Sequence, residues 1–425
     1  MSAAGGVIAA LRRRPGGEQL LALAASGEEL ALVGGAVRDL LLERTPRELD
    51  VVVARDAERI ARELASSLSE EGEGEPLLSS HERFGTASVQ WHAGRVDIAA
   101  RRAESYPAPG ALPEVREGSI EEDLARRDFT VNALAVPLGG AHAGELLGAE
   151  HALEDLSASR LRVLHARSFI DDPTRLLRLA RYRARLAFEP EPHTARLARE
   201  ALAAGALATV SGARVGAELR LALAEDDPLE ALASHEELGV LAGLVAGLAL
   251  DRALAQRALA LAPQDASVQE LLLACLLLGP ARRTERSERA VRDLLDELEF
   301  PAGERDRVAR SAAYAAELAQ RLGLALRPSE LRELLDGQPL EAVALAGALG
   351  ESAGSQRSAE QARMWLDQLR HVRLDITGED LLAAGLQPGP QIGMRLQAAL
   401  SSKLDGELPA HDAHAELRAA LEASV

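Results

Sequence analysis

The apolar residues of this chain follow a helical repeat along most of its length. Beyond about residue 140, Leu, Ala and Val recur every three or four positions, as in SFIDDPTRLLRLARYRARL (168–186), ARVGAELRLALAE (213–225) and AVRDLLDELE (290–299). That spacing places apolar side chains on one face of an α-helix. Because aromatic residues make up only 2% of the chain, burial has to rely on many such helices. The pattern predicts a helix-rich protein.

Residues 30–136 depart from that helical repeat. LALV (30–33) and ELDVVV (48–53) read as strands, and GGAVRDLLLE (34–43) between them reads as a turn that enters a helix. A βαβ-like start is therefore expected. Asp56 has the position of an N-cap for the following helix AERIARELASSL.

A hairpin and a capped helix are predicted later in the same region. ASVQWH and RVDIAAR flank Ala93-Gly94, a spacing that suits antiparallel strands joined by a two-residue turn. Asp97 lies on the second of these strands. Ser119 and Glu122 form a capping box ahead of EDLARR, which predicts a helix start there.

Charge and composition restrict the location and the partners of the chain. The formal net charge of -18 argues against a nonspecific nucleic-acid coat, so an RNA partner needs a concentrated arginine face. Arg12, Arg13 and Arg14 follow a weakly apolar stretch without a long h-region, and the longest apolar stretch, 238–250, is shorter than the roughly 20 residues that cross a bilayer. A cytoplasmic protein is expected. Cys275 is the single cysteine, which excludes a disulfide framework and a Cys-based zinc site.

Two motifs near the N-terminus suit phosphate chemistry. Gly34 and Gly35 end a strand and enter a helix that bears Arg38, so backbone, helix N-terminus and guanidinium can approach a polyphosphate. Glu48 and Asp50 share one face of the next strand, where two carboxylates can bind Mg²⁺ for two-metal phosphoryl transfer. Read singly, the first motif fits an ordinary strand-to-helix turn and the second an exposed strand edge.

Other polar residues extend this set. Asp97, on a strand between Val96 and Ile98, is a candidate third carboxylate, although outward alternation also explains it. In EEDLARRDFTVNALA, Arg127 suits a triphosphate, and Asp128 and Asn132 can bind ribose hydroxyls. The helix dipole alone would also favour arginine at that helix end.

A row of polar side chains is expected along one later helix. Asp172, Arg175, Arg178 and Arg181 recur at three-residue spacing, which would let them read a base and follow phosphates. The alternative is an aspartate-capped helix with Pro173 in its first turn and its arginines on a solvated face.

Taken in order, these segments resemble the class II tRNA nucleotidyltransferases, the family of CCA-adding enzymes and bacterial poly(A) polymerases. The resemblance rests on GGAVRDLLLERTPRELDVVV, FGTASV, ARRAESYPAPGALPEV, SIEEDLARRDFTVNALA and DDPTRLLRLARYRARL, which cover most of the first 190 residues. VSGARVGAELRLAL and GEDLLAAGLQPGPQIG resemble the body and tail segments of the family. Each segment is a weak signal singly, but their order is highly specific.

The resemblance implies an α+β fold in four parts. A polymerase-β-like nucleotidyltransferase head with a mixed sheet would span 1–140, and the rest would be helical. The expected helical parts are a base-recognising neck at 141–215, a body at 216–327 and an RNA-binding tail at 328–425.

The resemblance also implies roles for individual residues. The triphosphate-binding residues would be Gly34, Gly35 and Arg38. The catalytic carboxylates would be Glu48, Asp50 and Asp97, with Glu48 and Asp50 as the Mg²⁺ ligands. The residues in contact with the nucleotide and its ribose would be Arg127, Asp128 and Asn132. The protein template that hydrogen-bonds the incoming base would be Asp172 and Arg175, and Arg178 and Arg181 would extend it toward phosphate.

The implied activity is template-independent addition of CMP and AMP from CTP and ATP to a tRNA 3′ end, with release of pyrophosphate. No protein partner and no membrane are expected. Arginines concentrated over 160–185 would bind the RNA end, and scarce aromatics favour a folded tRNA over an unstructured tail. A CC-only enzyme, an A-only enzyme and a poly(A) polymerase remain open. Glu48, where the family pattern usually has Asp, leaves a noncatalytic RNA-binding protein as a further alternative.

Overall fold

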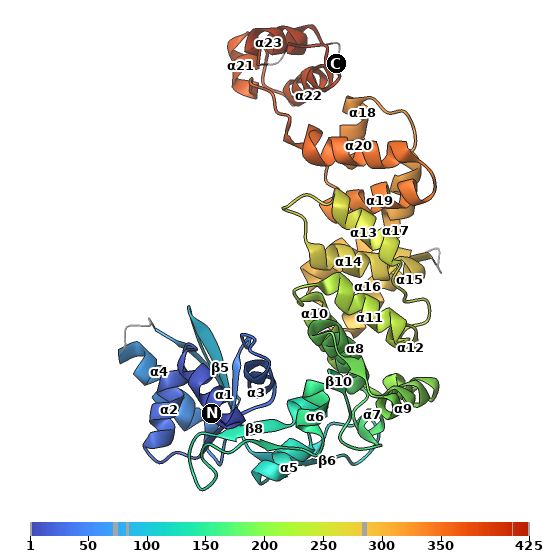
Figure 1. Ribbon diagram of the computed structural model, residues 1–425. Helices are drawn as coiled ribbons and strands as arrows, with labels where there is room; N and C mark the ends of the chain where they lie inside the picture. The colour runs from blue at the N-terminus through green and yellow to red at the C-terminus, as the bar shows by residue number, and fades with distance from the viewer. Residues whose placement is uncertain (1, 71–74, 82–84, 283–286, 410, 424–425) are drawn as a thin grey trace. The chain divides into compact units, whose positions relative to one another are not determined.

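A seven-stranded mixed sheet forms the framework of the N-terminal part of the chain (Figure 1). The computed structural model describes residues 2–70, 75–81, 85–282, 287–409 and 411–423, so Phe84 of FGTASV lies outside the described residues. The strands of the sheet are β1 (Leu30–Val33), β2 (Leu49–Val53), β3 (Leu77–His81), β4 (Thr86–Trp91), β5 (Gly94–Ala100), β8 (Leu134–Pro137) and β9 (Leu147–Gly148). Their order across the sheet is β3-β4-β5-β2-β1-β8-β9.

The central strand β2 has one parallel and one antiparallel neighbour. It runs parallel to β5 and antiparallel to β1, which confirms the expected mixed sheet. The expected βαβ-like start is wrong in its pairing, since that unit requires parallel strands. Two consecutive strands can pair in parallel only if the connection between them carries the chain back to the end of the sheet where the first strand began. The eight-residue helix α3 (Gly34–Leu41) instead leaves the chain near the end of β1, so β2 runs back alongside it.

Helices cover the sheet on both faces. On one face, α5 (Ile120–Ala125) packs its Ile120 and Leu124 against Val33 and Val52 of the sheet. On the other, α4 (Ala57–Glu70) lies along β3, β4 and β5 and buries apolar residues at helical spacing. The Asp56 side chain accepts a hydrogen bond from the Arg59 backbone N–H at 3.1 Å, which confirms the predicted N-cap.

The predicted hairpin and capping box are both present. β4 and β5 are antiparallel, but Trp91 already pairs with Gly94, so the turn is His92-Ala93, one residue earlier than predicted. The Ser119 side chain accepts from the Glu122 backbone N–H, and the Glu122 side chain accepts from the Ser119 backbone N–H. This box determines where α5 begins.

Further short elements surround the sheet. The helices are α1 (Ala3–Arg12), α2 (Gly17–Ala25), α6 (Ala152–Ser157), α7 (Ser168–Asp171), α8 (Thr174–Leu186), α9 (Pro192–Ala203) and the 3₁₀ turns η2 (Thr130–Asn132) and η3 (Ala206–Thr209). The strands are β6 (Arg102–Ser105) and β7 (Glu114–Glu117), which pair antiparallel, and β10 (Arg160–Leu161) and β11 (Glu189–Pro190), which pair parallel.

The segment 141–215 is not all-helical as predicted. β9 pairs with β8, so the sheet extends past residue 140, and β10 and β11 form a second small sheet. The single helix expected from 168 to 186 is divided into α7 and α8. Pro173 explains the division, because it lacks the N–H that a continuous helix would use.

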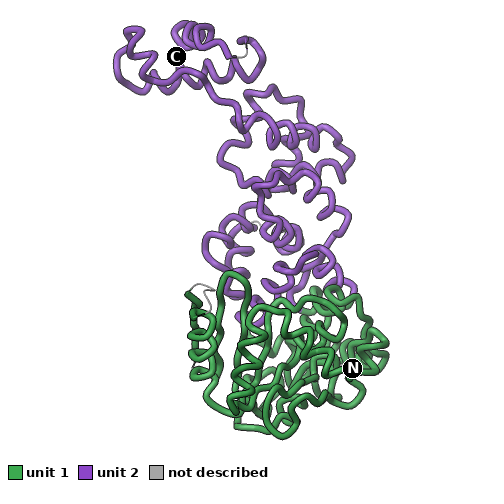
Figure 2. Tube along the Cα trace, turned by 60° about the vertical axis from the view of Figure 1, so that its left-hand side comes forward, with its two compact units in different colours: residues 1–211, 238–243 green, residues 212–237, 244–425 purple. Residues whose placement is uncertain are grey.

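The chain divides into two compact units (Figure 2). Unit 1 comprises residues 1–211 and 238–243, and unit 2 comprises 212–237 and 244–425. Every residue assigned a role in the sequence analysis lies in unit 1. The finer division into head, neck, body and tail stays a prediction.

Unit 2 is helical in its described part, as predicted. Its helices are α10 (Gly212–Leu223), α11 (Pro228–Glu237), α13 (Arg252–Leu261), α14 (Val268–Leu276), α15 (Leu278–Arg282), α16 (Ser287–Glu297), α17 (Ala302–Leu322), α18 (Pro328–Leu335), α19 (Leu340–Ser352), α20 (Gln356–Asp367), η4 (Leu369–His371), α21 (Gly378–Ala383), α22 (Pro390–Leu404) and α23 (Ala413–Glu422). The short α12 (Val240–Leu244) begins in unit 1. The last three helices share a core of their own, formed by Ile376, Leu381, Ala399 and Ala420.

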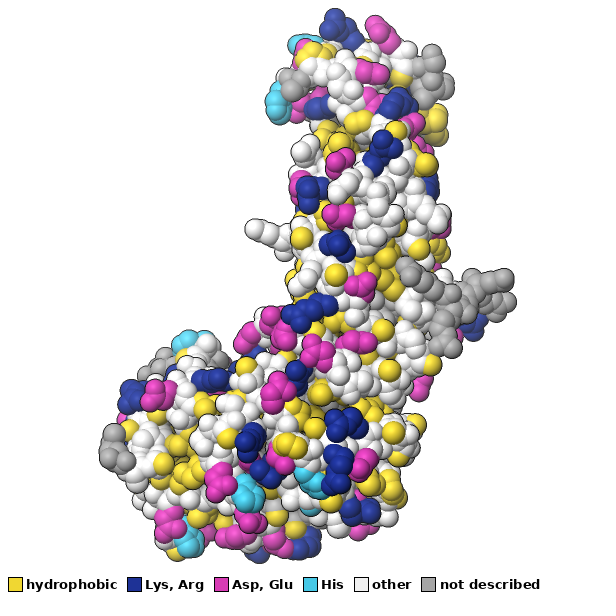
Figure 3. Space-filling model, turned by 45° about the vertical axis from the view of Figure 1, so that its right-hand side comes forward, with side chains coloured by type: hydrophobic (Ala, Val, Ile, Leu, Met, Phe, Trp, Pro, Cys, Tyr) yellow, Lys and Arg dark blue, Asp and Glu magenta, His cyan; other side chains and the backbone are white. Residues whose placement is uncertain are grey.

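The single cysteine and the surface charges are two features on which the composition led to expectations. Cys275 is buried in α14, and burial raises the pKa of its thiol to about 12, so it is a core residue as predicted. Figure 3 shows cationic and anionic side chains interspersed over the visible face rather than separated into two regions. Among the described residues, no helix combines the length and the apolar character that crossing a membrane requires.

Candidate nucleotidyltransferase site

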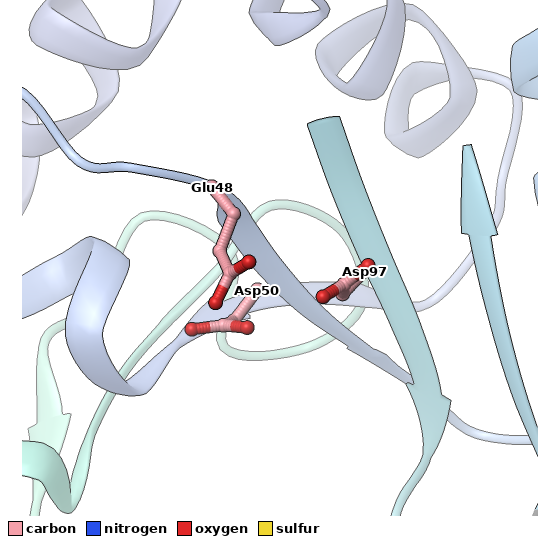
Figure 4. A group of neighbouring side chains, drawn as sticks. All are labelled: Glu48, Asp50 and Asp97. Atoms are coloured by element: carbon pink, nitrogen blue, oxygen red, sulfur yellow. The ribbon is translucent and has the colours of Figure 1, made fainter. Parts of the chain in front are cut away.

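Three carboxylates meet on neighbouring parallel strands of unit 1. Asp50 of β2 and Asp97 of β5 are direct partners in the strand register, so both side chains leave the sheet on the same face. Glu48 immediately precedes β2, since the strand begins at Leu49 and not at Glu48 as predicted. Ligand oxygens of Glu48, Asp50 and Asp97 all lie within 4.8 Å of one another (Figure 4).

The cluster carries unbalanced negative charge. Burial, followed by the charges of Glu48 and Asp97, raises the pKa of Asp50 to about 7, although Arg127 and Arg38 act in the opposite direction. Three hard oxygen donors that repel one another suit a divalent cation. The side chains present therefore fit the metal site that the sequence predicted.

Arg95 is a neighbour of this cluster that the sequence analysis missed. Its Nε donates to Asp97 Oδ1 at 2.8 Å and lies 3.9 Å from Glu48 Oε2. Arg95 and Asp97 are two residues apart on β5, so strand alternation could have identified the pair. In the absence of a cation, Arg95 partly balances the cluster.

The turn at Gly34 opens beside the carboxylates. Gly34 has φ of +66°, and a Cβ atom there would lie 2.5 Å from Arg127 Nη1. A Cβ on Gly35 would lie 3.5 Å from Arg38 Nη2 and 3.8 Å from Asp50 Oδ2. The two glycines therefore bring bare backbone, two guanidinium groups and a carboxylate together at the N-terminus of α3.

Replacing Gly34 by alanine is expected to weaken nucleotide binding about tenfold. Alanine strains the left-handed backbone by about 1–2 kcal/mol and displaces the Arg127 guanidinium from the turn. Calorimetric titration with CTP measures the affinity. Gly205→Ala is the control, because Gly205 has a similar φ of +72° with nothing near its Cβ position. Equal CTP affinity in both variants and the wild type would contradict the prediction.

A buried network connects the remaining predicted residues of α3 and η2. Arg38, 1% exposed, donates through Nε to Asp39 and through Nη1 to Asn132 Oδ1. Asn132 Nδ2 in turn donates to Asp128 Oδ1 at 2.9 Å, and Arg178 Nε donates to Asp128 Oδ2 at 2.8 Å. Sequence separations of 94 and 50 residues are closed by these contacts.

Two arginines of α8 differ from the solvated face that one of the two sequence-based interpretations expected. Arg175 and Arg181 are 4% and 5% exposed, so the solvated arginine face is wrong for these two residues. Arg175 donates to Ser168 Oγ at 2.6 Å and to the Arg126 backbone oxygen at 2.7 Å. Asp172 accepts from both the N–H and the Oγ1 of Thr174, but the N-cap of α8 is Pro173, so the expected aspartate N-cap with Pro173 inside the first turn is wrong.

Tyr182 is a second residue that the sequence analysis missed. Its ring packs edge-on against Phe129, with ring centroids 6.0 Å apart. Four guanidinium carbons lie between 4.9 and 6.0 Å from the ring centroid, those of Arg38, Arg178, Arg181 and Arg185. In the sequence Tyr182 reads as an ordinary helix residue, because its contacts with Arg38 and Phe129 are long-range.

Several arginines of 160–185, the stretch expected to bind the RNA end, are paired with carboxylates. Arg162 makes two hydrogen bonds to Asp155, Arg167 pairs with Asp171, and Arg183 pairs with Glu189. These carboxylates lie within the stretch or a few residues from its ends. Its positive potential is therefore lower than its arginine count indicates.

Comparisons with known proteins agree with this geometry. The Poly A polymerase head domain family matches residues 30–162. The CC-adding tRNA nucleotidyltransferase of Deinococcus radiodurans is 35% identical over 399 residues, which cover 93% of this chain and 89% of that protein. The chain belongs to the tRNA nucleotidyltransferase family. The resemblance read from the motif order is confirmed.

Other members of the tRNA nucleotidyltransferase family extend the comparison. The A-adding tRNA nucleotidyltransferase of Geobacter sulfurreducens is 31% identical over 94% of this chain and 46% of that protein. The chain spans about half the length of the A-adding relatives that it matches. The Thermotoga maritima CCA-adding enzyme complexed with tRNA superposes with a TM-score of 0.73 and 25% identity, over 97% of each chain. The predicted fold class, a mixed-sheet head followed by helical parts, is that of this family.

Proposed function

We propose that this chain adds CMP and AMP, from CTP and ATP, to the 3′ end of tRNA without a nucleic-acid template and releases pyrophosphate. One observation carries the proposal: a three-carboxylate cluster lies beside the Gly34 turn in a chain of the tRNA nucleotidyltransferase family. A relative that is named CC-adding and others that are named A-adding support both nucleotides as substrates.

The carboxylates would hold Mg²⁺, with Glu48 and Asp50 as ligands and Asp97 beside them. Bound Mg²⁺ ions supply the positive charge that stabilises charge developing on the transferred phosphate and on the leaving pyrophosphate. Glu48 and Asp97 favour cation binding further, because they keep the neighbouring Asp50 electrostatically unsatisfied in the cation-free protein.

The nucleotide would lie between the Gly34 turn and α8. Gly34, Gly35, Arg38 and Arg127 would bind the triphosphate, since these residues bring N–H groups and guanidinium groups to one turn. Asp128 and Asn132, which already share a hydrogen bond, would bind the ribose. Asp172 and Arg175 would read the base. Arg178 and Arg181 would support this surface, the first through its ion pair with Asp128.

The division into a head at 1–140, a neck at 141–215, a body at 216–327 and a tail at 328–425 is part of the proposal. The helical parts would bind the tRNA. A cytoplasmic location follows from the substrates, because tRNA, CTP and ATP are found there.

The test is extension of tRNA that lacks its terminal CCA. The purified chain, with Mg²⁺, CTP and ATP, is expected to lengthen the RNA by the missing nucleotides and to release pyrophosphate. Sequencing gels resolve the product length. Failure to incorporate either nucleotide would refute the proposed activity.

The same tRNA distinguishes CCA addition from the related activities. A CC-only enzyme adds two cytidines with CTP and nothing more when ATP is present. An A-only enzyme requires tRNA that already ends in CC, and a poly(A) polymerase adds a run of A. Two tRNA substrates, one that lacks CCA and one that ends in CC, are each incubated with CTP, with ATP and with both. The length of the product distinguishes these outcomes.

A noncatalytic RNA-binding protein is the remaining alternative, motivated by Glu48 in place of the usual Asp. The wild-type protein and the Glu48→Asp variant are compared in tRNA binding and in nucleotide addition. Binding without addition in both proteins supports the alternative. Addition only in Glu48→Asp would identify the longer side chain as the cause.

A further inference from the structure

Asp123 is a buried carboxylate that none of the proposed roles includes. It lies on α5 and is 0% exposed. Its Oδ1 accepts from Nε and Nη2 of Arg126 at 3.0 and 2.7 Å, and its Oδ2 accepts from Nη2 of Arg127 at 2.9 Å. One carboxylate therefore holds two consecutive arginines that leave the end of α5 in different directions.

Arg127 depends on this contact more than Arg126 does. Arg126 also donates to Glu104 at 3.1 Å, so it has a second carboxylate. Within the described ranges, Asp123 is the single hydrogen-bond acceptor of the Arg127 guanidinium, and Arg127 Nε is buried without a partner. Without Asp123, Arg126 would keep an ion pair and Arg127 would lose its own.

The free side of Arg127 faces the turn at the N-terminus of α3. Its Nη1 lies 2.5 Å from the position that a Cβ of Gly34 would take. Its positive charge also acts on Asp50. The donors that Asp123 leaves unused therefore lie between the bare backbone of Gly34 and the carboxylate cluster, where phosphate oxygens would be bound.

We propose that Asp123 is a positioning residue, which fixes the Arg127 guanidinium against the Gly34 turn so that its free donors meet the triphosphate. An arginine side chain has several rotatable bonds, so ordering it when the nucleotide binds would cost conformational entropy. Asp123 orders Arg127 before the nucleotide binds. This inference rests on the proposed function, because it assumes that the turn receives a nucleotide triphosphate.

The charge state of Asp123 agrees with this role. Burial opposes its ionisation, but Arg127 and Arg126 outweigh burial and lower the pKa of the carboxyl. Asp123 is therefore an anion at neutral pH. An amide at the same position would accept more weakly and would present N–H groups to the two guanidinium groups.

The first experiment measures nucleotide binding by Asp123→Asn with CTP, ATP and inorganic triphosphate as separate probes. Affinity for all three is expected to fall about tenfold, because the lost contact is to the triphosphate and not to the base. In the transfer assay KM for CTP and ATP should rise equally while kcat changes less than about threefold. Unchanged affinity for all three probes would overturn the proposal.

Asp155→Asn is the matched control. Asp155 is 1% exposed in the same unit and accepts hydrogen bonds from Arg162 and Thr130, and no side-chain hydrogen bond in the described part of the chain joins it to a proposed nucleotide-binding residue. Its replacement should lower the melting temperature without lowering triphosphate affinity. Equal loss of triphosphate affinity in both variants would show a general effect of instability and would overturn the positioning role.

A double-mutant cycle with Arg127→Met tests whether Asp123 changes the triphosphate affinity through Arg127. If Asp123 acts through Arg127, adding Asp123→Asn to Arg127→Met causes no further loss of triphosphate affinity. Additive losses would overturn the proposal. Asp123→Ser, which is smaller and cannot crowd the guanidinium groups, replaces Asp123→Asn if that variant does not fold. Failure of both to fold would mean a structural role only, which also overturns it.

The experiment separates this inference from the proposed function. If the wild type binds inorganic triphosphate but transfers no nucleotide, the proposed activity fails and the Asp123 cycle is still decided by binding. If transfer succeeds and the cycle is additive, the activity stands and the positioning role fails.

Discussion

Asp50→Asn is expected to lower nucleotide addition on the order of a thousandfold and to stabilise the cation-free protein at about pH 8. Activity is expected to fall because an amide would be a neutral and weaker ligand than a carboxylate for the proposed Mg²⁺. Stability rises because burial and the charges of Glu48 and Asp97 make an ionised carboxyl costly at this position, with a pKa of about 7.

The direction of this pH dependence follows from the number of protons that the folded and the unfolded states bind. Asp50 retains its proton in the folded protein up to about pH 7, whereas in the unfolded chain it loses it near the ordinary value of 3.8. The folded state binds more protons across that window, so stability declines as pH rises through it. Removing the group eliminates the decline, a difference on the order of 2–4 kcal/mol at about pH 8.

Thermal melting of the wild type and Asp50→Asn without divalent cations, at several pH values, measures this difference. The gap between their melting temperatures should widen from about pH 5 to about pH 8, and Mg²⁺ should narrow it by stabilising the wild type. Glu28→Gln is the control, because pairing with Arg59 lowers the pKa of Glu28. That variant should retain activity and gain no stability. If the difference between the two melting temperatures did not depend on pH, ionisation of Asp50 would not destabilise the cation-free protein.

Asp128→Asn is expected to destabilise the protein by about 2–3 kcal/mol and to weaken nucleotide binding. Asp128 is 5% exposed and is the common acceptor of Asn132 and Arg178. The amide removes the negative charge that pairs with the Arg178 guanidinium and disturbs the hydrogen bond that orients Asn132. Arg38 donates to Asn132 as well as to Asp39, so one of its contacts would be disturbed too.

The pH dependence distinguishes this effect from a loss of packing. Burial opposes ionisation of Asp128, but Arg178 and Asn132 outweigh it and lower its pKa from 3.8 to about 2. The stabilisation is present above about pH 4 and is lost as pH falls toward about 2, an amount of roughly 2 kcal/mol. The difference in melting temperature between the wild type and Asp128→Asn should therefore be larger at about pH 7 than at about pH 3. CTP affinity that is unchanged in folded Asp128→Asn would exclude Asp128 from the nucleotide site.

Much of the local structure follows from residues close together in the sequence. The Asp56 N-cap, the Ser119–Glu122 box and the β4–β5 hairpin are each determined by side chains within a few positions of the element they define. Pairing between strands is different, because β2 could meet β1 in either direction until the length of α3 is known. The βαβ-like expectation failed for this reason.

The three carboxylates of the cluster could be proposed from the sequence, but their contacts could not. Glu48, Asp50 and Asp97 could be proposed from alternation, because two-residue periodicity puts Asp50 and Asp97 on definite faces of their strands. Whether those faces coincide depends on the parallel register of β2 with β5, which no local signal specifies. Asp123 and Tyr182 were missed because their significance lies in partners that other elements bring to them.

The sequence by itself determined the helical character of the chain, its helix caps, and the set of polar residues whose order identifies the tRNA nucleotidyltransferase family. These are properties of short segments and of residue chemistry. The tertiary structure alone decided which carboxylates lie together, that Arg38 is buried in an ion pair with Asp39, and why the pKa of Asp50 is raised to about 7. The physical reason is that burial and Coulomb interactions depend on distances across the fold, and those distances exist only when the strands and helices have packed.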